Sequence, residues 1–353
     1  KGAEEAEGAE GAGGGGRGGA FLTLTAVPAT ADETARWDEL VAATEAPHLL
    51  QTTGWAALKG ATGWEPRRYL FRDGARVAGL AQVLLRRLPL GVSVAYAARG
   101  PLVGPGDLPA ALVALRTALL GERGACLLAD PELAEDARLR ATLAGAGVRR
   151  SPVHIQPRRT LLVDLGPEPA DLLAAMRKKT RQYVHKAERE GVLTEETADL
   201  ARFLAVLGRV ATRDRFALHD PAYFVRLREV FGDRAHLFIA RVGGDDAGAL
   251  LVVRFAGRAW ELFGGWSGTQ AEHRPFYLLK WRALLRMRAL GVRRYDMWGL
   301  DEDGSLAGVE NFKRGFGGEE ATWLGMLETP VVPLLWPIWR VIGRRRLARA
   351  GQA

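Results

Sequence analysis

The sequence predicts an α+β protein in which two domains with the same order of elements follow one another. The chain has 353 residues, which is long enough for two domains of ordinary size, each with its own core. Apolar residues make up 48% of it and charged residues 25%, which is the balance of a globular protein. Both halves also show helices, a run of strands, a further helix and a buried strand in that order.

The first half begins with amphipathic helices. Residues Glu33–Ala43 place Trp37 and Val41 on one face, and His48–Lys59 is predicted to form a turn and a second helix. The pair Asp73-Gly74 favours a tight turn between the next two strands. The later elements are strands Arg67–Arg72, Arg76–Arg86 and Val92–Ala97, helix Leu108–Leu120, strand Ala125–Ala129 and helix Arg138–Ala146.

The second half begins with strand Thr160–Leu165 and a long basic helix, Pro169–Arg189, that ends before Gly191. Its later elements are helices Leu200–Arg215 and Pro221–Phe231, the hairpin Ala235–Val242 and Ala247–Phe255, strand Arg258–Gly265, helix Pro275–Leu290 and strand Arg294–Trp298. This is the element order of an N-acetyltransferase (GNAT) domain. We therefore expect two tandem acetyltransferase-like domains, each a mixed, mostly antiparallel sheet flanked by helices.

Changes in composition predict the limits of these domains. Residues 1–20 consist of Gly, Ala and Glu around one Lys and one Arg, so we expect a disordered low-complexity segment. Residues 21–160 are predicted to form the first domain and 161–329 the second. Residues 330–353 are predicted to form a basic aromatic tail. Within it, Val331–Ile342 is apolar but too short to span a bilayer.

Charge and cysteine content restrict the class of partner and the compartment. The net charge of +8 favours a polyanionic partner such as nucleic acid, a nucleotide-linked substrate or an anionic membrane. A Gly/Ala/Arg-rich composition inherited from a GC-rich genome is the alternative explanation. The single cysteine, Cys126, excludes a disulfide within this sequence, and the histidines never fall at metal-ligand spacing. We expect a cytoplasmic protein without a metal.

The loop that binds the donor in an acetyltransferase domain has an unusual sequence here. Such domains hold the donor pyrophosphate on a Gly-rich loop between the central strand and the next helix. Residues 265–275 lack the R/Q-x-x-G-x-G/A pattern of that loop, and so does the first half. The sequence therefore argues against acyl-coenzyme A as donor. It indicates acyl transfer to an amine from a different donor, without a cofactor.

Five short motifs in order resemble Fem-type (FemABX) aminoacyltransferases, which build peptidoglycan bridges. The resemblance covers roughly residues 37–327 and is most similar to the branch that adds alanine to a nucleotide-linked precursor. Each motif alone is weak, but five in the right order are fairly specific. The motifs are Gln51–Lys59 (Q-x-x-x-W-x-x-x-K), Tyr96–Pro101 (Y-x-x-[RK]-G-P), Ile155–Arg158, the basic segment Arg177–Lys186, and Phe312–Phe316 (F-K-x-x-F).

The resemblance implies an enzyme that moves an amino acid from aminoacyl-tRNA to an amine of a peptidoglycan-precursor peptide stem. The implied acceptor is UDP-linked or lipid-linked, and a monomer is expected. Two other functions stay open: an N-acyltransferase that uses acyl-coenzyme A or acyl-carrier protein, and a non-enzymatic nucleic-acid binder. Where the family is expected to have an aromatic residue with a hydroxyl group, this chain has Phe263, which has none. The family's Tyr-x-Gly appears here as Trp323-Leu324-Gly325. These departures concern substrate identity more than reaction class.

The resemblance also implies the catalytic residues. Lys313 is expected to stabilise the oxyanion that forms when an amine attacks an aminoacyl ester. Phe312 is expected to stack on the terminal adenine of the tRNA. No general base stands out. Nearby carboxylates that fit no motif are Asp296, Asp301, Asp303 and Glu310.

Cations elsewhere are candidates for binding the two substrates. The resemblance implies that Lys59 and Arg213 bind the diphosphate of the acceptor. The alternatives are a solvated Lys59 and an Arg213 paired through Asp214. The other acceptor-binding candidates are Arg215, Tyr96 and Trp55.

The basic helix is the candidate tRNA-binding surface. Its cations gather at the helix start, where the dipole favours acids, so an anionic ligand such as the tRNA backbone is implied. A solvated face is the alternative. The candidates are Arg177, Lys178, Lys179, Arg181 and Lys186. In the tail, Trp336 and Trp339 with the following arginines predict peripheral contact with the inner membrane through residues 331–349, or else a packed terminal helix.

Overall fold

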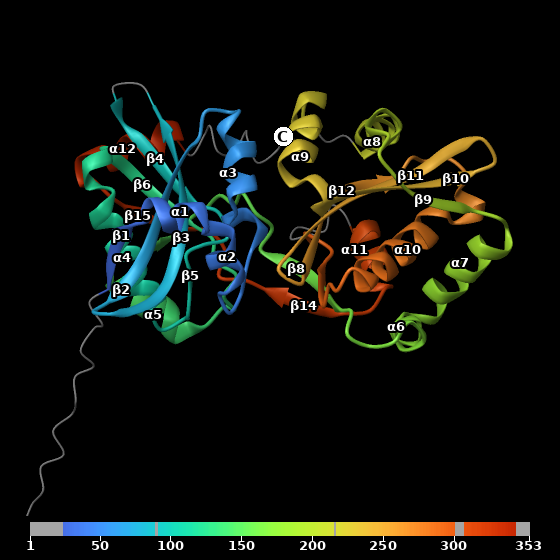
Figure 1. Ribbon diagram of the computed structural model, residues 1–353, viewed down its shortest axis with the longest axis horizontal. Helices are drawn as coiled ribbons and strands as arrows, with labels where there is room; N and C mark the ends of the chain where they lie inside the picture. The colour runs from blue at the N-terminus through green and yellow to red at the C-terminus, as the bar shows by residue number, and fades with distance from the viewer. Residues whose placement is uncertain (1–23, 89–90, 215–216, 301–306, 344–353) are drawn as a thin grey trace, which may run out of the picture.

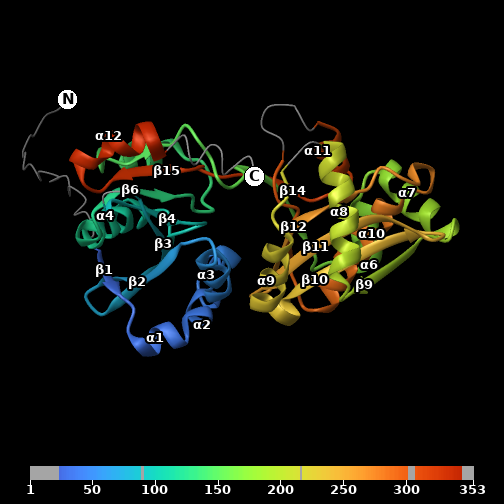
Figure 2. The same cartoon turned by 90° about the horizontal axis from the view of Figure 1, so that it is seen from above.

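The computed structural model describes residues 24–88, 91–214, 217–300 and 307–343. Two α+β halves lie side by side, each built on one mixed sheet (Figures 1 and 2). Within the described residues the first sheet has eight strands and the second has seven. Parallel pairing joins a single pair of strands in each sheet, and the other described pairs are antiparallel.

The first sheet has the strand order β1-β2-β3-β4-β6-β15-β7, with β5 paired to β3. The strands are β1 (Thr25–Pro28), β2 (Glu65–Asp73), β3 (Arg76–Arg87), β4 (Ser93–Ala97), β5 (Leu102–Val103), β6 (Gly124–Ala129), β7 (Arg149–Arg150) and β15 (Leu327–Pro330). The helices of this half are α1 (Ala31–Ala35), α2 (Trp37–Ala42), α3 (Thr53–Gly60), α4 (Leu108–Ala118), α5 (Ala137–Gly145) and α12 (Trp336–Ile338).

The second sheet has the strand order β14-β8-β13-β12-β11-β10-β9. The strands are β8 (Arg159–Asp164), β9 (Leu193–Thr197), β10 (Ala235–Val242), β11 (Asp245–Phe255), β12 (Arg258–Trp266), β13 (Arg294–Asp296) and β14 (Glu319–Thr322). The helices of this half are α6 (Pro169–Ala175), α7 (Lys178–Arg189), α8 (Leu200–Asp214), α9 (Pro221–Phe231), α10 (Pro275–Ala289) and α11 (Ala307–Arg314).

The parallel pair of the second sheet separates after three residues. Strands β12 and β13 pair from Arg258↔Arg294 to Trp260↔Asp296. Beyond Trp260, β12 continues along β11 to Trp266, whereas β13 ends at Asp296. An opening between two parallel strands exposes backbone and side chains at their ends, which is where ligands bind in such sheets.

The two halves share one hydrophobic core. Trp55 of α3 and Phe231 of α9 belong to the same cluster of buried residues, and the two helices lie against each other where the halves meet (Figure 2). The close approach depends on Gly54, because a Cβ at this position would lie 2.8 Å from the Phe231 ring. The second half also has a core of its own, which includes Trp281 and Phe316.

Two helices expected from the sequence are each divided in the structure. The segment Glu33–Ala43 is split at Arg36 into α1 and α2. The long basic helix is split at Met176 and Arg177, whose backbones are extended. The expectation of one continuous helix over Pro169–Arg189 is therefore wrong. Met176 is buried, and the Arg177 nitrogen donates to the Gly315 carbonyl at 2.9 Å, so a tertiary contact replaces the helical hydrogen bond.

The end of the described chain returns to the first half. Strand β15 pairs with β6 and β7, and the red β15 and α12 lie among the blue and green elements of that half in Figure 1. The expected domain limit after residue 329 thus falls inside a strand of the first sheet. Glu328 is buried there and accepts a hydrogen bond from the Ser151 hydroxyl at 2.7 Å. Among the described residues, no helix is both long and apolar enough to cross a membrane.

Candidate active site

A cleft of about 340 Å³ opens at the end of β12, beyond the segment that pairs with β13. It is formed by the end of β12, the first turn of α10 and helix α11. Residues that line it include Arg213, Trp266, Arg274, Tyr277, Val309 and Phe312. A larger cavity of about 790 Å³ lies near α6 and α10, but none of the site residues predicted from the sequence lines it. The cleft at α11 is therefore the better candidate for the active site.

Lys313 directly follows Phe312, which lines this cleft. Its Nζ donates to the carbonyl oxygen of Gly299 at 2.6 Å and also to that of Trp298. An ammonium group has three N–H donors, so these two carbonyls leave one donor for a further acceptor. Burial lowers the pKa of Lys313 to about 8, and the amine therefore stays mostly charged at neutral pH.

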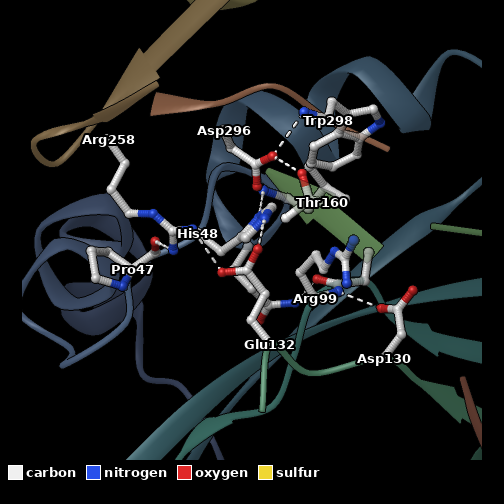
Figure 3. Close-up of polar contacts among 12 residues, drawn as sticks. Pro47, His48, Arg99, Asp130, Glu132, Thr160, Arg258, Asp296 and Trp298 are labelled. Carbon is white, nitrogen blue, oxygen red and sulfur yellow. Dashed lines mark hydrogen bonds and ion pairs between the residues drawn. The ribbon is translucent and has the colours of Figure 1, made fainter. Parts of the chain in front are cut away.

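The two carbonyls are presented by a left-handed turn that follows β13. Trp298 has a φ of +49° and Gly299 a φ of +64°. A large residue such as Trp is costly in this region, by about 1–3 kcal/mol, and such strain persists where surrounding contacts impose it. Asp296 imposes it here, because its Oδ1 accepts a hydrogen bond from the Trp298 nitrogen at 2.8 Å and another from the Thr160 hydroxyl (Figure 3).

Residues of the first half contact the Trp298 side chain of this turn. The Arg99 guanidinium lies 5.5 Å from the centre of the Trp298 ring and donates to the Pro157 carbonyl at 2.7 Å. The ring of His48 lies 6.2 Å from that of Trp298. Both side chains therefore connect the first half to the segment that holds Lys313.

An ion-paired cluster fixes the junction of the two halves (Figure 3). Arg258 of β12 donates to the Pro47 carbonyl at 2.9 Å and to the Glu132 carboxylate at 2.7 Å. His48 Nε2 lies 3.3 Å from the other oxygen of Glu132. Burial lowers the pKa of His48 to about 4, so its imidazole is neutral at physiological pH. Burial acts to raise the pKa of Glu132, but Arg258 and His48 outweigh it and hold that pKa well below its usual range.

Phe312 belongs to an aromatic cluster at the cleft. Its ring stacks on Phe276 at 5.2 Å and meets the edge of Tyr277 at 4.8 Å. Phe312 therefore lines the cleft, whereas the Nζ of Lys313, the next residue, is bound to the carbonyls of Trp298 and Gly299. The nearby carboxylates have structural partners: Asp296 holds the turn, and Glu310 pairs with Arg159 and Arg314. Asp301 and Asp303 lie outside the described residues.

Lys59 lies in an aromatic box where α3 meets α9. Its Nζ is 4.8 Å from the ring centre of Trp55 and 5.4 Å from that of Tyr223. In the described parts of the chain, this Nζ forms no hydrogen bond or ion pair. Burial lowers its pKa to about 8. His219 stacks on Tyr223 at 4.1 Å, and burial together with the Lys59 charge lowers the pKa of His219.

The other predicted acceptor ligands have partners within the protein. Arg213 lines the cleft, but its guanidinium forms two hydrogen bonds with Asp214, at 2.7 and 2.6 Å, and another with the Trp266 carbonyl. The Tyr96 hydroxyl is buried and donates to Asp130 at 2.8 Å. Direct substrate contact by Tyr96 is therefore not supported. Trp55 is buried too and forms a wall of the box around Lys59, and Arg215 lies outside the described residues.

The predicted tRNA-binding cations divide into two groups. Arg177, Lys178 and Lys179 are exposed. Arg181 instead donates to the carbonyls of Ala174 and Met176, and Lys186 pairs with Glu190 one turn later. These last two cations are already used inside the protein, because helix ends need partners for their free carbonyls and i,i+4 ion pairs stabilise a helix.

A row of cations and aromatic rings joins the exposed face of α7 to the cleft. Lys179 Nζ lies 5.7 Å from the Tyr183 ring centre, and the Arg274 guanidinium lies 4.4 Å from the same centre. Tyr183 meets Tyr277 edge-on at 4.9 Å, and Tyr277 in turn meets Phe312. These five residues are called the cation–aromatic row below: Lys179, Tyr183, Arg274, Tyr277 and Phe312.

Arg274, like Tyr277, is a member of this row that the motifs did not indicate. It lines the cleft, and its buried Nε has no hydrogen-bond partner among the described residues. Its place directly before Pro275, in the loop that departs from the donor-binding pattern, was the signal available in the sequence. Three or more His, Cys, Asp or Glu that could hold a metal ion do not gather anywhere in the described parts.

The architecture is that of known acyltransferase folds. A family model described as an acetyltransferase (GNAT) domain matches residues 174–314, a range that contains the cleft. A tandem GNAT protein from the clavulanic acid biosynthesis pathway superposes with a TM-score of 0.51 at 19% identity, over 88% of this chain and 98% of that one. The chain has the tandem GNAT fold. The α+β tandem GNAT prediction is thus confirmed.

This chain is also similar to a second solved structure and to curated proteins. The crystal structure of FemX superposes with a TM-score of 0.78 at 20% identity, covering 88% of this chain and 98% of that one. The lipid II:glycine glycyltransferase of Staphylococcus aureus strain USA300 is 28% identical over 212 residues, covering 55% of this chain and 50% of that protein. The chain thus spans about half the length of the curated relatives it matches.

Proposed function

We propose that this tandem GNAT protein is an aminoacyltransferase that forms peptidoglycan interpeptide bridges. It would move an amino acid from aminoacyl-tRNA to an amine on the peptide stem of a peptidoglycan precursor. The observation that carries the proposal is the Lys313 amine, which two backbone carbonyls hold with one N–H donor left over, in the residue that follows Phe312 of the cleft. The similarity to lipid II:glycine glycyltransferases of Staphylococcus aureus supports the substrate class.

The proposed reaction needs an oxyanion stabiliser more than it needs a protein base. The acceptor amine attacks the ester carbonyl of the aminoacyl group, and the remaining N–H of Lys313 stabilises the tetrahedral oxyanion. The C–O bond to the ribose then breaks, and the ribose oxygen takes the proton that the amine loses. Asp296 and Glu310 do not serve as the base, since both already have structural partners.

The cation–aromatic row is the proposed binding site of the tRNA 3′ end. Phosphates would contact Lys179 and Arg274, and unpaired bases would stack on Tyr183 and Phe312, as in other single-strand binding sites. Arg177 and Lys178 would contact phosphates further from the cleft. The intramolecular partners of Arg181 and Lys186 support a structural part for these two residues.

Lys59 is the stronger of the two proposed diphosphate ligands. It is a partly desolvated cation without an anion among the described residues, and a phosphate would supply one. Arg213 could join only if a phosphate displaced Asp214. The box continues toward the cleft, because Tyr223 meets Phe263 at 6.1 Å and Phe263 lies three residues before Trp266. The acceptor would therefore lie along the end of β12.

The form of the acceptor is a finer proposal. A UDP-linked precursor and the alanine-adding branch rest on the motif resemblance. A lipid-linked precursor rests on the printed name of the Staphylococcus aureus relatives. With a tRNA donor, either form places the reaction in the cytoplasm, and a lipid-linked one adds peripheral membrane contact. Trp336 and Trp339 are buried against the first half, so such contact would use Leu334 and Val341, which are 88% and 57% exposed.

A second candidate function is N-acyl transfer from acyl-coenzyme A or acyl-carrier protein. The first turn of α10, from Pro275 to Tyr277, lines the cleft, and helix N-termini bind phosphates. The loop before it still lacks the glycines that let a pyrophosphate approach the backbone. The helix N-terminus that would bind a pyrophosphate is thus present, but the R/Q-x-x-G-x-G/A pattern of the loop before it is not. We therefore rank this function second.

One experiment separates these functions. The protein is incubated with a charged tRNA pool and either a UDP-linked or a lipid-linked pentapeptide precursor, and product masses are read. An increase by one amino-acid residue is expected, with uncharged tRNA as the control. Parallel reactions contain acetyl-coenzyme A or acyl-carrier protein in place of tRNA. Acyl products from these donors alone would overturn the tRNA-dependent proposal.

A further inference from the structure

A second ionic cluster lies beneath the cleft, on three different elements. Lys280 of α10 donates to both oxygens of Glu261 of β12, at 2.5 and 2.6 Å. The Tyr295 hydroxyl of β13 donates to the same carboxylate at 3.0 Å. Glu261 follows Trp260, so it lies at the point where β12 leaves β13. The cluster therefore lies where the two strands separate, and its Lys280 faces two rings that line the cleft.

This ion pair is buried, and burial makes it costly. The Lys280 side chain is 1% exposed and the Glu261 side chain 9%. Removing two charges from water costs several kcal/mol per ion, and apolar residues of similar size often stabilise a fold as well as such a pair does. Stability alone thus gives little reason to keep Glu261 and Lys280 at these positions.

The presence of lysine rather than arginine at these positions also indicates a role beyond stability. Lys and Arg together number 49, but only seven of these are Lys. Among the lysines that the structure describes, burial lowers the pKa of three, Lys59, Lys280 and Lys313. Arginine stays charged at every physiological pH, whereas the charge of a buried lysine responds to its neighbours. Lysine at 280 and 313 therefore permits each charge to influence the other.

The cluster adjoins Lys313 through the aromatic rings of the cleft. Lys280 Nζ lies 5.6 Å from the Phe276 ring centre and 5.4 Å from that of Phe312, the residue before Lys313. Burial lowers the pKa of Lys313, and among charged neighbours Glu261 raises it, Lys280 lowers it and Asp296 raises it. Tyr295 faces the same carboxylate and is neutral, since burial raises the pKa of its hydroxyl well above the ordinary value.

We propose that Glu261 and Lys280 are positioning residues that set the charge of the Lys313 side chain. The carboxylate of Glu261 keeps Lys313 cationic although it is buried, and the ammonium of Lys280 limits that effect. Tyr295 holds the Glu261 carboxylate through its hydrogen bond. The inference rests on the proposed function for its catalytic meaning, because there Lys313 must carry a proton to stabilise the oxyanion.

The charge of Lys313 can be measured without any substrate. Protein labelled with carbon-13 at the lysine ε-carbons gives at most seven signals, and the Lys313 signal is the one that disappears in Lys313→Met. Its chemical shift is followed from pH 6 to pH 11. In Glu261→Gln we expect the titration midpoint to fall by about one pH unit, because a carboxylate nearby favours the charged amine.

Lys280→Met provides the opposite test. It breaks the same ion pair but removes a positive charge, so the Lys313 midpoint should rise. A purely structural disturbance would move both variants in one direction. Tyr295→Phe is the matched control, since it removes a hydrogen bond to Glu261 without a charge, and its midpoint should shift less than either. If Glu261→Gln fails to fold, the double variant Glu261→Gln/Lys280→Met is used, and its midpoint should lie below that of Lys280→Met.

An unchanged midpoint in Glu261→Gln, or shifts of the same sign in Glu261→Gln and Lys280→Met, would overturn the inference. The pH–rate profile is then compared with the titrations. The alkaline limb of kcat should follow the Lys313 midpoint in each variant. A failure of the proposed function has a different signature: no transfer in the wild-type protein, with the Lys313 midpoints still shifting as expected.

Discussion

The carboxylate of Asp296 accepts a hydrogen bond at 2.8 Å from the backbone nitrogen of Trp298, two residues later. This contact holds Trp298 at a φ of +49° and turns two successive carbonyls toward Lys313. The Lys313 side chain, which is proposed for catalysis, is therefore oriented by backbone carbonyls that the Asp296 carboxylate holds in place. Each of the two relationships can be tested separately.

Replacing Lys313 with Met should leave the fold intact and remove most turnover. Loss of one oxyanion stabiliser costs about 3–4 kcal/mol, which corresponds to about 10²–10³ in rate. The measurement is kcat with saturating charged tRNA and precursor, alongside a thermal melt that confirms folding. A folded Lys313→Met protein with full activity would show that the oxyanion has another stabiliser.

Replacing Asp296 with Ala should lower kcat by about 10-fold and change the substrate KM values little. The reason is that the Trp298 turn loses its acceptor, and misplacement of a catalytic group lowers the rate without loss of binding. Asp296→Asn keeps an acceptor oxygen and should recover most of the loss. Equal loss in both variants would indicate that the charge of Asp296, rather than its hydrogen bond, is what the site needs.

Replacing Lys59 with Ala should raise the KM for the precursor and leave tRNA affinity almost unchanged. A charge-assisted phosphate contact contributes about 1.5–3 kcal/mol, so a change of about 10–100-fold is expected. Arg213→Ala should have a smaller effect, because Arg213 already pairs with Asp214. Lys178→Ala is the matched control and should show the reverse pattern.

The double variant Lys59→Ala/Arg213→Ala decides whether the two residues hold one diphosphate. Its effect on the precursor KM should be less than additive if they do. Additive effects would place them at separate subsites. If Lys59→Ala instead weakens tRNA and spares the precursor, the two substrate sites must be exchanged.

Affinity for tRNA should fall steeply with salt, because each phosphate contact releases a counterion. Lys179→Ala and Arg274→Ala should each reduce the slope of log K against log salt by about 1. Lys186→Ala is the control on the same helix, and its slope should stay near that of the wild type because Lys186 pairs with Glu190. A flat salt dependence in the wild type would favour the carrier-protein donor.

Acidification should weaken the junction of the two halves through His48. Burial lowers the pKa of His48 to about 4, whereas the unfolded value is about 6.5. The unfolded chain thus binds a proton first, so this part of the stability is present above about pH 6.5 and is lost as pH falls toward 4. The loss at pH 4.5 should be about 2–3 kcal/mol relative to His48→Gln. Denaturant unfolding of both proteins at several pH values measures it, and parallel curves would contradict it.

Much of the fold could be predicted from short-range patterns. The apolar runs of β10 and β11, and the apolar face of α8, predicted elements close to those observed, because each of these patterns is contained in one short segment. The order of elements then predicted the tandem GNAT fold. Phe312, which the same motif indicated, lines the cleft, whereas the catalytic part of Lys313 stays a prediction.

The tertiary structure decided which charged residues remain available to a ligand. Arg181 and Lys186 look like Lys178 and Lys179 in the sequence, but only the folded chain shows carbonyls beside Arg181. Lys280 and Glu261 are isolated charges in apolar segments until β12 and α10 pack together. Strand β15 joins the first sheet through partners about 200 residues earlier. Periodicity reports only which face of an element is apolar, and the burial and pairing of a charge depend on segments brought together by the whole fold.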